Sequence, residues 1–335
     1  MRKKLKITVL VDAAEITGED PNFEGHPKVP TTEHHVTGAL RNLGHEVYVL
    51  GAVSDIGKIV NTLAELKPDI VFNITEAFEG DRWMDKNIAA LIEMAGMPFT
   101  GTGVAGLMLC RDKRLCKQLL SLHKIRVPNF YSLPLGHKVP VAKTIHYPLV
   151  VKPALEDSSE GISNASLVNT VAELQERTRY MHERWKQPAI AEEYIEGREL
   201  YVSLLGNKKM TVLPPREFFF DSDTGAGPQL ATYRVKWNEQ YREKWNIRFG
   251  FAELDQTTLK NIGHVCKKVF RVLQLRDYSR IDLRLTKDNK VVILEANPNP
   301  DLAYGEEVAE AAEHGGMGYE ELIDRIIHIA LRRYK

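Results

Sequence analysis

The order of the apolar segments near the start of this 335-residue chain constrains its fold more than any other feature. Short strand-like runs at 7–11, 46–50 and 69–73 alternate with helical patterns at about 32–43 and 56–66. Alternation of this kind favours a parallel sheet covered by helices. We therefore expect an α/β domain in this part of the chain.

The rest of the sequence predicts two further lobes. A glycine-rich connection at 95–113 ends the first domain. Further predicted elements are helices at 112–123, 170–185, 256–273 and 319–331, strands at 149–152, 189–195, 199–205 and 211–213, a polar, aromatic-rich excursion to about 250, and a hairpin at 280–297. We place the three domains at 1–108, 109–198 and 199–335, sizes that are ordinary for single domains.

The predicted hairpin at 280–297 has one apolar and one charged face. A turn centred on Asp288 and Asn289 has a fixed register. It pairs Asp282 with Glu295, Arg280 with Asn297, Ile281 with Ala296, Leu283 with Leu294, and Leu285 with Val292. Like charges directly across a strand pair are destabilising, so we expect a cation between the two acids.

Magnesium is one candidate for that cation. It takes carboxylate and amide oxygens and usually keeps phosphate as a further ligand, so Asp282, Glu295 and Asn297 form a candidate metal site. The alternative is a surface hairpin whose acids pair with Arg280 and Arg284. A slip of one residue in the register would also move every side chain to the opposite face.

Composition excludes several classes of function. Lys plus Arg and Asp plus Glu are equal at 45 each, so the net charge does not indicate binding to nucleic acid or to an anionic membrane. The basic start is interrupted by Asp12, which favours a first strand over a signal peptide, and we expect a cytoplasmic protein. The cysteines, Cys110, Cys116 and Cys266, are too few and too scattered for a disulfide framework or a zinc site.

A serine- and glycine-containing segment follows the predicted strand that ends at Lys152. Ser158, Ser159, Gly161 and Ser163 can offer hydroxyls and backbone amides to phosphate. The segment matches neither standard phosphate-loop motif, so an ordinary loop remains an alternative. The acidic run "EEYIEGRE" follows further along, and a solvated edge strand would look the same.

The order of these pieces is more specific than any one of them. A lysine on a helix, a lysine at a strand end, a serine loop, an acidic strand and a hairpin with the pattern D…ExN follow one another in this sequence. The whole order resembles the ATP-grasp superfamily and, within it, the D-alanine:D-alanine ligase family. The resemblance implies an N-terminal parallel α/β domain and two lobes that sandwich ATP. It also implies activation of a carboxylate as an acyl phosphate, followed by attack of an amine.

The resemblance assigns roles to particular residues. It implies that Asp282, Glu295 and Asn297 hold two Mg²⁺ ions, that Arg280 stabilises the acyl-phosphate and tetrahedral states, and that Glu33 receives the ammonium group of the first substrate. The ATP-binding residues that it implies are Lys113, Lys152, Ser158, Ser159, Glu192, Glu193, Ile195, Glu199, Lys236 and Leu294. Among these, Ser158 in the phosphate loop and Lys236, which reaches the terminal phosphate, are also implied to act in catalysis.

The sequence departs from the family pattern around the second substrate. Trp237 stands in place of a tyrosine, Asp157 replaces a loop glycine, and Asp301 replaces the glycine after the NxxP pattern. Glu306 and Glu307 stand where the family holds a carboxylate with a serine and a backbone amide. Acids at this place would repel a carboxylate, unless both point to solvent.

We therefore expect an ATP-dependent and Mg²⁺-dependent carboxylate–amine ligase that acts on an amino acid or a small peptide. The acceptor amine need not be D-alanine. An authentic D-alanine:D-alanine ligase and a catalytically silent ATP-binding module remain as alternatives. We expect no nucleic-acid or membrane partner, and a homodimer stays open as an assembly.

Overall fold

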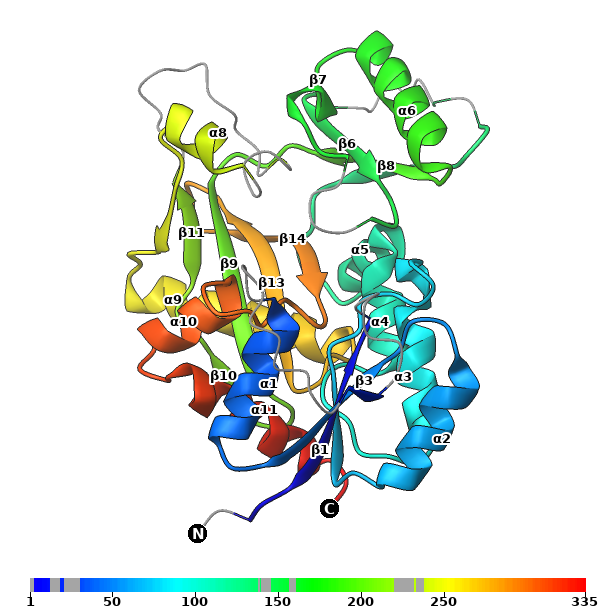
Figure 1. Ribbon diagram of the computed structural model, residues 1–335. Coiled ribbons are helices and arrows are strands. Elements are labelled where there is room, and N and C mark those ends of the chain that lie inside the picture. Colours follow the sequence, from blue (N-terminus) through cyan, green and yellow to red (C-terminus); the bar gives the residue numbers. More distant parts are fainter. Residues whose placement is uncertain are drawn as a thin grey trace.

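The computed structural model describes residues 3–12, 19–20, 31–137, 139, 146–156, 161–219, 232 and 238–335. In this part of the chain three separate sheets form, one in each of three lobes (Figure 1). The α/β class and the predicted three-lobed organisation are therefore observed.

The N-terminal sheet has the predicted parallel core. Its strands are β1 (Lys6–Val11), β3 (Glu46–Gly51) and β4 (Ile70–Asn73), with the short β2 (Glu19–Asp20) antiparallel at the edge, in the order β2-β3-β1-β4. Helix α1 (Thr32–Asn42) covers one face, and α2 (Ile56–Leu66) and α3 (Asp85–Met94) cover the other. Because strand side chains alternate between faces, Val9 packs with α1 while Leu10 packs with α2.

The central lobe is a small antiparallel sheet with one covering helix. Its strands are β5 (Phe130–Leu133), β6 (Leu149–Pro153), β7 (Leu167–Val168) and β8 (Ala189–Glu193), in the order β5-β8-β6-β7. Helix α6 (Val171–Trp185) packs Leu174 and Met181 against Val151 and Ala191. Strand β8 ends at Glu193, two residues earlier than predicted. Tyr194 still donates its backbone N–H to the Pro148 carbonyl, but a proline has no N–H with which to return the hydrogen bond.

The C-terminal sheet positions most of the candidate residues. Its strands are β9 (Arg198–Gly206), β10 (Met210–Val212), β11 (Arg216–Phe219), β12 (Arg248–Phe251), β13 (Tyr278–Leu285) and β14 (Val291–Asn297). The order is β12-β11-β9-β13-β14, with β10 paired to β9. Helices α5 (Lys113–Leu122) and α9 (Gln256–Val272) cover one face. Helices α10 (Glu307–His314) and α11 (Tyr319–Leu331) pack with α1 at one end of the other face.

Two segments contain more regular structure than the sequence predicted. The predicted connection at 95–113 contains helix α4 (Val104–Arg111), and the excursion before 250 contains β11, β12 and helix α8 (Glu239–Lys244). The glycines of the first segment serve close packing. A Cβ at Gly106 would lie 2.9 Å from the carbonyl oxygen of Gln274, and one at Gly101, where φ is +92°, would lie 2.7 Å from Asn299 Oδ1.

All three cysteines are buried thiols that form no disulfide within the part of the chain that the structure describes, as expected. Burial raises the pKa of the Cys116 thiol to about 11, so this thiol stays protonated near neutral pH. None of the helices that the structure describes is both long enough and apolar enough to cross a membrane.

Asp277 joins the lobes at the start of β13. It is fully buried and accepts hydrogen bonds from Arg333 Nη2 at 2.8 Å, the Gly101 N–H at 2.8 Å and Asn207 Nδ2 at 2.9 Å. The same Arg333 nitrogen donates to the Phe99 carbonyl at 2.6 Å. Asp277 therefore fixes β13 against both the N-terminal domain and the C-terminal end of the chain.

We expect Asp277→Asn to lower the free energy of unfolding by about 3 to 5 kcal/mol, because Arg333 would lose its buried counter-charge. Chemical denaturation measures this directly. Arg333→Met in the same chain should recover part of the loss, because it removes the unpaired charge. Unchanged stability of the single variant would show that this contact does not hold the lobes together.

Candidate functional site

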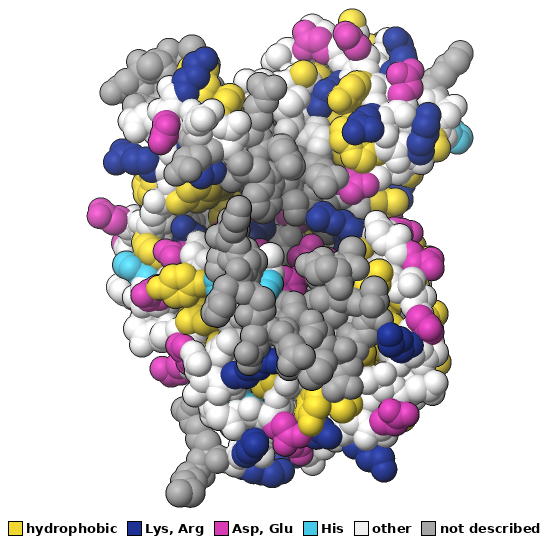
Figure 2. All heavy atoms as spheres, viewed as in Figure 1, with side chains coloured by type: hydrophobic (Ala, Val, Ile, Leu, Met, Phe, Trp, Pro, Cys, Tyr) yellow, Lys and Arg dark blue, Asp and Glu magenta, His cyan; other side chains and the backbone are white. Residues whose placement is uncertain are grey.

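The candidate residues from the central and C-terminal lobes converge on one cleft, with a cavity of about 80 Å³. Its lining residues are Val150, Lys152, Ile162, Glu192, Glu193, Tyr194, Ile195, Glu199, Tyr201, Asp282, Arg284, Leu294 and Glu295. Figure 2 shows basic and acidic side chains gathered in the hollow between the lobes. The cleft thus brings together six of the predicted ATP-binding residues and both metal acids, most of them from strands β6, β8, β9, β13 and β14.

The hairpin of β13 and β14 has the predicted pairing at the end that carries Asp282 and Glu295. Its pairing differs from the prediction near the turn. Arg280 pairs with Asn297 and Asp282 with Glu295, as predicted. A bulge follows, so Leu283 pairs with Ile293 and Leu285 with Val291, and the predictions for Leu283 and Leu285 are wrong.

The turn explains the difference. It is a three-residue loop in which Asn289 adopts a positive φ of 56°, and its N–H donates to the Thr286 carbonyl. The loop and the bulge shift the register in opposite directions. The two acids therefore still face each other.

Basic side chains offset the predicted repulsion between Asp282 and Glu295. Asp282 accepts from Arg280 Nε at 2.8 Å and from Arg280 Nη2 at 3.1 Å. Glu295 forms an ion pair with Lys113 Nζ at 2.8 Å. Protein side chains therefore supply positive charge beside both acids. The pairing of an acid with Arg280, which belonged to the surface-hairpin alternative, is observed, although Asp282 is buried. Arg284 instead pairs with Glu199 Oε2 at 2.6 Å.

A buried lysine pair holds Glu192. Lys152 Nζ lies 3.0 Å from one carboxylate oxygen of Glu192, and Lys117 Nζ lies 3.2 Å from the other. Lys117 also donates to the backbone carbonyl of Leu294, the residue at the bulge. All three side chains of this triad are less than a tenth exposed. Burial is the main reason why the pKa of Lys117 is lowered, and Glu192 opposes the shift.

Lys117 was missed by the sequence analysis. It lies one helical turn after Lys113 on α5, so both point from the same face of the helix toward the cleft. That i, i+4 spacing was the available signal. Two lysines rather than one therefore reach the cleft from α5.

The predicted ribose side of the site is also built around a buried ion pair. Glu199 accepts from Arg284 and from the Tyr201 hydroxyl at 3.2 Å, while Arg284 also donates to the Gly197 carbonyl at 2.9 Å. Burial favours a lower pKa for Arg284, but the adjacent Glu199 outweighs it and the pKa is raised. Glu193, predicted at the hinge, accepts from the N–H and the side-chain amide of Asn129.

Arg280 is the centre of a cluster of charged side chains on this sheet. Besides its two contacts with Asp282, it donates to Glu307 Oε2 at 3.0 Å, and its guanidinium lies 5.1 Å from the Tyr201 ring centroid. Burial alone would lower the pKa of Arg280, but the carboxylates of Asp282 and Glu307 raise it. The group stays cationic at every physiological pH.

The acidic acceptor candidates do not simply point to solvent. Glu307 binds Arg280, and Asp301 accepts from Thr32 Oγ1 at 2.6 Å. Glu306, at the start of α10, is partly buried and forms no side-chain cap with that helix. Burial, with the nearby charges of Glu307 and Asp301, raises the pKa of Glu306 to about 7. The alternative in which both glutamates face solvent is therefore wrong.

Glu33, the candidate for the first substrate's ammonium group, lies in the first turn of α1. Its charge acts on Asp12 at the end of β1, whose pKa is raised mainly by burial and to a smaller extent by Glu33. The neighbouring Thr32 contacts Asp301, so α1 connects this region with the acceptor side. Ser158, Ser159, Asp157, Lys236 and Trp237 lie outside the described residues.

The donor set fits magnesium. Asp282 and Glu295 face each other, and Asn297 is two residues along the same strand face, where its amide oxygen can serve as a further ligand. No cluster of three or more His, Cys, Asp or Glu suited to a metal occurs in the described ranges. Two carboxylates and an amide suit an ion that shares its coordination with phosphate oxygens and water.

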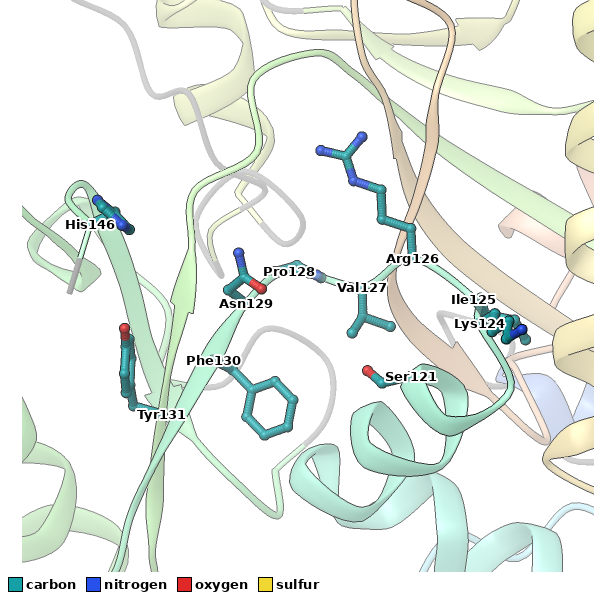
Figure 3. A pocket seen from close by; sticks show the side chains of 10 residues that line it. All are labelled: Ser121, Lys124, Ile125, Arg126, Val127, Pro128, Asn129, Phe130, Tyr131 and His146. Atoms are coloured by element: carbon teal, nitrogen blue, oxygen red, sulfur yellow. The ribbon is translucent and has the colours of Figure 1, made fainter. Parts of the chain in front are cut away.

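A larger surface groove, of about 610 Å³, lies outside this cleft. Figure 3 shows its lining from the end of α5, the segment after it and the start of β5, with Arg126, Asn129 and Tyr131 spread apart around an open space. Its lining residues include none of the predicted site residues. The convergence of buried charges in the cleft makes the cleft the better candidate site.

Comparison with known proteins agrees with this geometry. The family model described as D-ala D-ala ligase C-terminus matches residues 129–328. The chain is 32% identical over 306 residues to the uncharacterized protein y4sG of Sinorhizobium fredii (strain NBRC 101917 / NGR234), covering 89% of this chain and 87% of that protein. It is 28% identical over 295 residues to a D-alanine–D-alanine ligase of Aquifex aeolicus (strain VF5), covering 87% of this chain and 92% of that protein.

A solved structure shares the fold. The crystal structure of D-alanine–D-alanine ligase from Bacillus anthracis complexed with ATP matches with a TM-score of 0.71 and 19% sequence identity, covering 98% of each chain. The N-terminal parallel sheet and the two antiparallel lobes therefore form an ATP-grasp fold. Because the family model matches more than half of this chain, the chain belongs to the D-alanine–D-alanine ligase family.

Proposed function

We propose that this protein is an ATP-dependent ligase that joins the carboxylate of an amino acid or small peptide to an amine through an acyl phosphate. One observation carries the proposal. Three buried lysines form ion pairs with Glu192 and Glu295, and Arg280 pairs with Asp282; all three carboxylates line a single cleft between two lobes. Buried charges in a cleft are costly unless they serve a structural pairing or a ligand, and this cleft contains residues to which the family resemblance assigns ATP binding.

Lys113, Lys117 and Lys152 would bind ATP. Phosphoryl transfer depends mainly on positioning and charge neutralisation, which cations at fixed positions supply. Their ion pairs with Glu192 and Glu295 keep these lysines pointed into the cleft. Ser158, Ser159 and Lys236 would complete the phosphate site from the segments next to it, and Glu193, Ile195, Glu199 and Leu294 would contact the base and ribose.

Asp282, Glu295 and Asn297 would hold two Mg²⁺ ions. Bound Mg²⁺ would neutralise charge on the transferring phosphoryl group and position it. Arg280 would stabilise the negative charge that develops on the acyl phosphate and at the tetrahedral stage, because it is buried and permanently cationic. Glu33 would bind the ammonium group of the first substrate.

This ligase would select its acceptor differently from a D-alanine–D-alanine ligase, whose acceptor has a free carboxylate beside the amine. Glu307 already occupies Arg280, and Glu306 is partly buried at the place where the family holds a carboxylate. A free carboxylate next to the acceptor amine would meet Glu306 at short range. An authentic D-alanine–D-alanine ligase therefore stands second, and a silent ATP-binding module third.

ADP formation with a panel of amino-acid pairs tests the proposal. A ligase should release ADP only with a productive pair, and mass spectrometry should detect the amide product. Preference for two molecules of D-alanine over every other pair would favour the second function. ATP binding without ADP formation on any pair would favour the silent module.

We expect Lys152→Met and Lys117→Met each to weaken ATP binding at least about tenfold. Each change removes a charge-assisted contact worth about 1.5 to 3 kcal/mol. Isothermal titration calorimetry gives the affinities. Lys260→Met, an exposed lysine on α9, is the matched control and should bind ATP normally. Normal affinity in both cleft variants would remove these lysines from the nucleotide site.

Magnesium should stabilise the protein only when nucleotide is present. Without nucleotide, the carboxylates of Glu295 and Asp282 form ion pairs with Lys113 and Arg280. Thermal melting with Mg²⁺ alone, a non-hydrolysable ATP analogue alone, and both together measures this cooperativity. Glu295→Gln should abolish it and lower the metal-free melting temperature, because Lys113 loses its partner. Glu313→Gln, exposed on α10, should keep it. A full stabilisation by Mg²⁺ alone would contradict the assignment.

Glu306 should discriminate against acceptors with a carboxylate beside the amine, and more strongly at higher pH. A glutamate at about 4 Å opposes a carboxylate by roughly 1 to 4 kcal/mol, depending on the local dielectric. Since the pKa of Glu306 is raised to about 7, its charge and the discrimination grow as the pH rises through 7. The ratio of kcat/KM for an amino-acid amide to that for the free acid, from pH 6 to 8, measures the effect. Glu306→Gln should flatten this profile, and an equally steep profile in that variant would exclude Glu306.

A further inference from the structure

Arg216 is a cation on the catalytic face of the C-terminal sheet that the proposed reaction leaves without a role. In the sheet it pairs with Tyr201, which pairs with Asp282, which pairs with Glu295. Directly paired residues of antiparallel strands point to the same face. Arg216 therefore lies on the same face as the metal acids, two strands away from Asp282, at about 10 Å from the spacing of strands.

The surroundings of Arg216 differ from those of the other arginines on this face. Arg280 and Arg284 each contact a carboxylate, at 2.8 Å and 2.6 Å. Arg216 forms no ion pair with any described residue, and its buried Nε has no hydrogen-bond partner there. Its guanidinium is held 5.6 Å from the Phe249 ring centroid and 6.0 Å from that of Phe251. A positioned guanidinium with a free donor is suited to a planar anion such as a carboxylate.

The neighbouring glutamate limits which anion can reach it. Arg216 is close enough to lower the pKa of Glu306, although the two do not form an ion pair. Glu306 therefore lies close to the space between Arg280 and Arg216, since the charges of both arginines act on it. An anionic group near the reacting amine meets Glu306, whereas one farther along the sheet meets Arg216.

We propose that Arg216 is the specificity-determining residue of a second acceptor subsite, which binds a carboxylate borne about 10 Å from the reacting amine. This inference rests on the proposed ligase function and names its acceptor class. The acceptor is an amine with a distant carboxylate, such as the C-terminal carboxylate of a short peptide. Three extended residues span about 10 Å, which matches the distance across the two strands.

The test compares triglycine with triglycinamide, which differ only in the terminal carboxylate. Calorimetry with the full-length protein, loaded with Mg²⁺ and a non-hydrolysable ATP analogue, gives both affinities. We expect triglycine to bind at least about tenfold more tightly than its amide. Arg216→Met should remove that difference and leave the affinities for the amide and for the nucleotide analogue unchanged.

Two further variants keep the result interpretable. Arg216→Lys retains the charge and should retain part of the preference, and Arg248→Met, an exposed arginine on β12, should retain all of it. Equal binding of acid and amide by the wild type, binding of neither, or a preference that survives Arg216→Met would each overturn the proposal. The calorimetric test of Arg216 needs no turnover, so it is independent of the test of the ligase function. Absence of ADP formation with every substrate pair would contradict the ligase function alone.

Discussion

The ion pairs between the acids and the cations of the cleft are the constraint on which the site depends. Glu192 is shared by Lys117 and Lys152, Glu295 is held by Lys113, and Asp282 by Arg280. Isolated buried charges would be too costly to keep, so each group requires its partner while the cleft is without ligand. ATP would offer new anions to the lysines, and Mg²⁺ a new cation to the acids. Exchange of partners, rather than creation of charge, would thus be the physical basis of the proposed nucleotide binding.

The metal hairpin shows how far sequence reasoning reaches. The pairing of Asp282 with Glu295 was predicted correctly from a two-residue turn that the structure does not contain. A three-residue loop and a bulge at Leu294 cancel, and the bulge exposes a carbonyl that accepts from Lys117. That stabilising contact joins residues 177 positions apart, so the hairpin sequence alone contains no sign of it.

The other omissions have a similar cause. The α/β order and the facing of Asp282 and Glu295 follow from local patterns, which a sequence displays directly. The ion pair of Arg284 with Glu199 spans 85 positions, and the glycines of 95–113 pack a helix against distant backbone. Arg216 gave no local signal either, because its position beside Tyr201 depends on a strand that the sequence did not predict. Long-range pairing, not composition, decided these features.

In the proposed reaction, Glu307 would link the chemistry of the phosphoryl group to the choice of acceptor. It contacts the same Arg280 that binds Asp282, and it begins helix α10 directly after Glu306. If metal binding draws Asp282 away, Glu307 still holds Arg280 and so keeps the start of α10 against the sheet. Glu306 then remains fixed beside the reacting centre, while Arg216 stays two strands farther away. Selection against a near carboxylate would therefore persist through the reaction, because Arg280 anchors the start of the helix next to Glu306. The position of Arg216 depends instead on the pairing of β11 with β9.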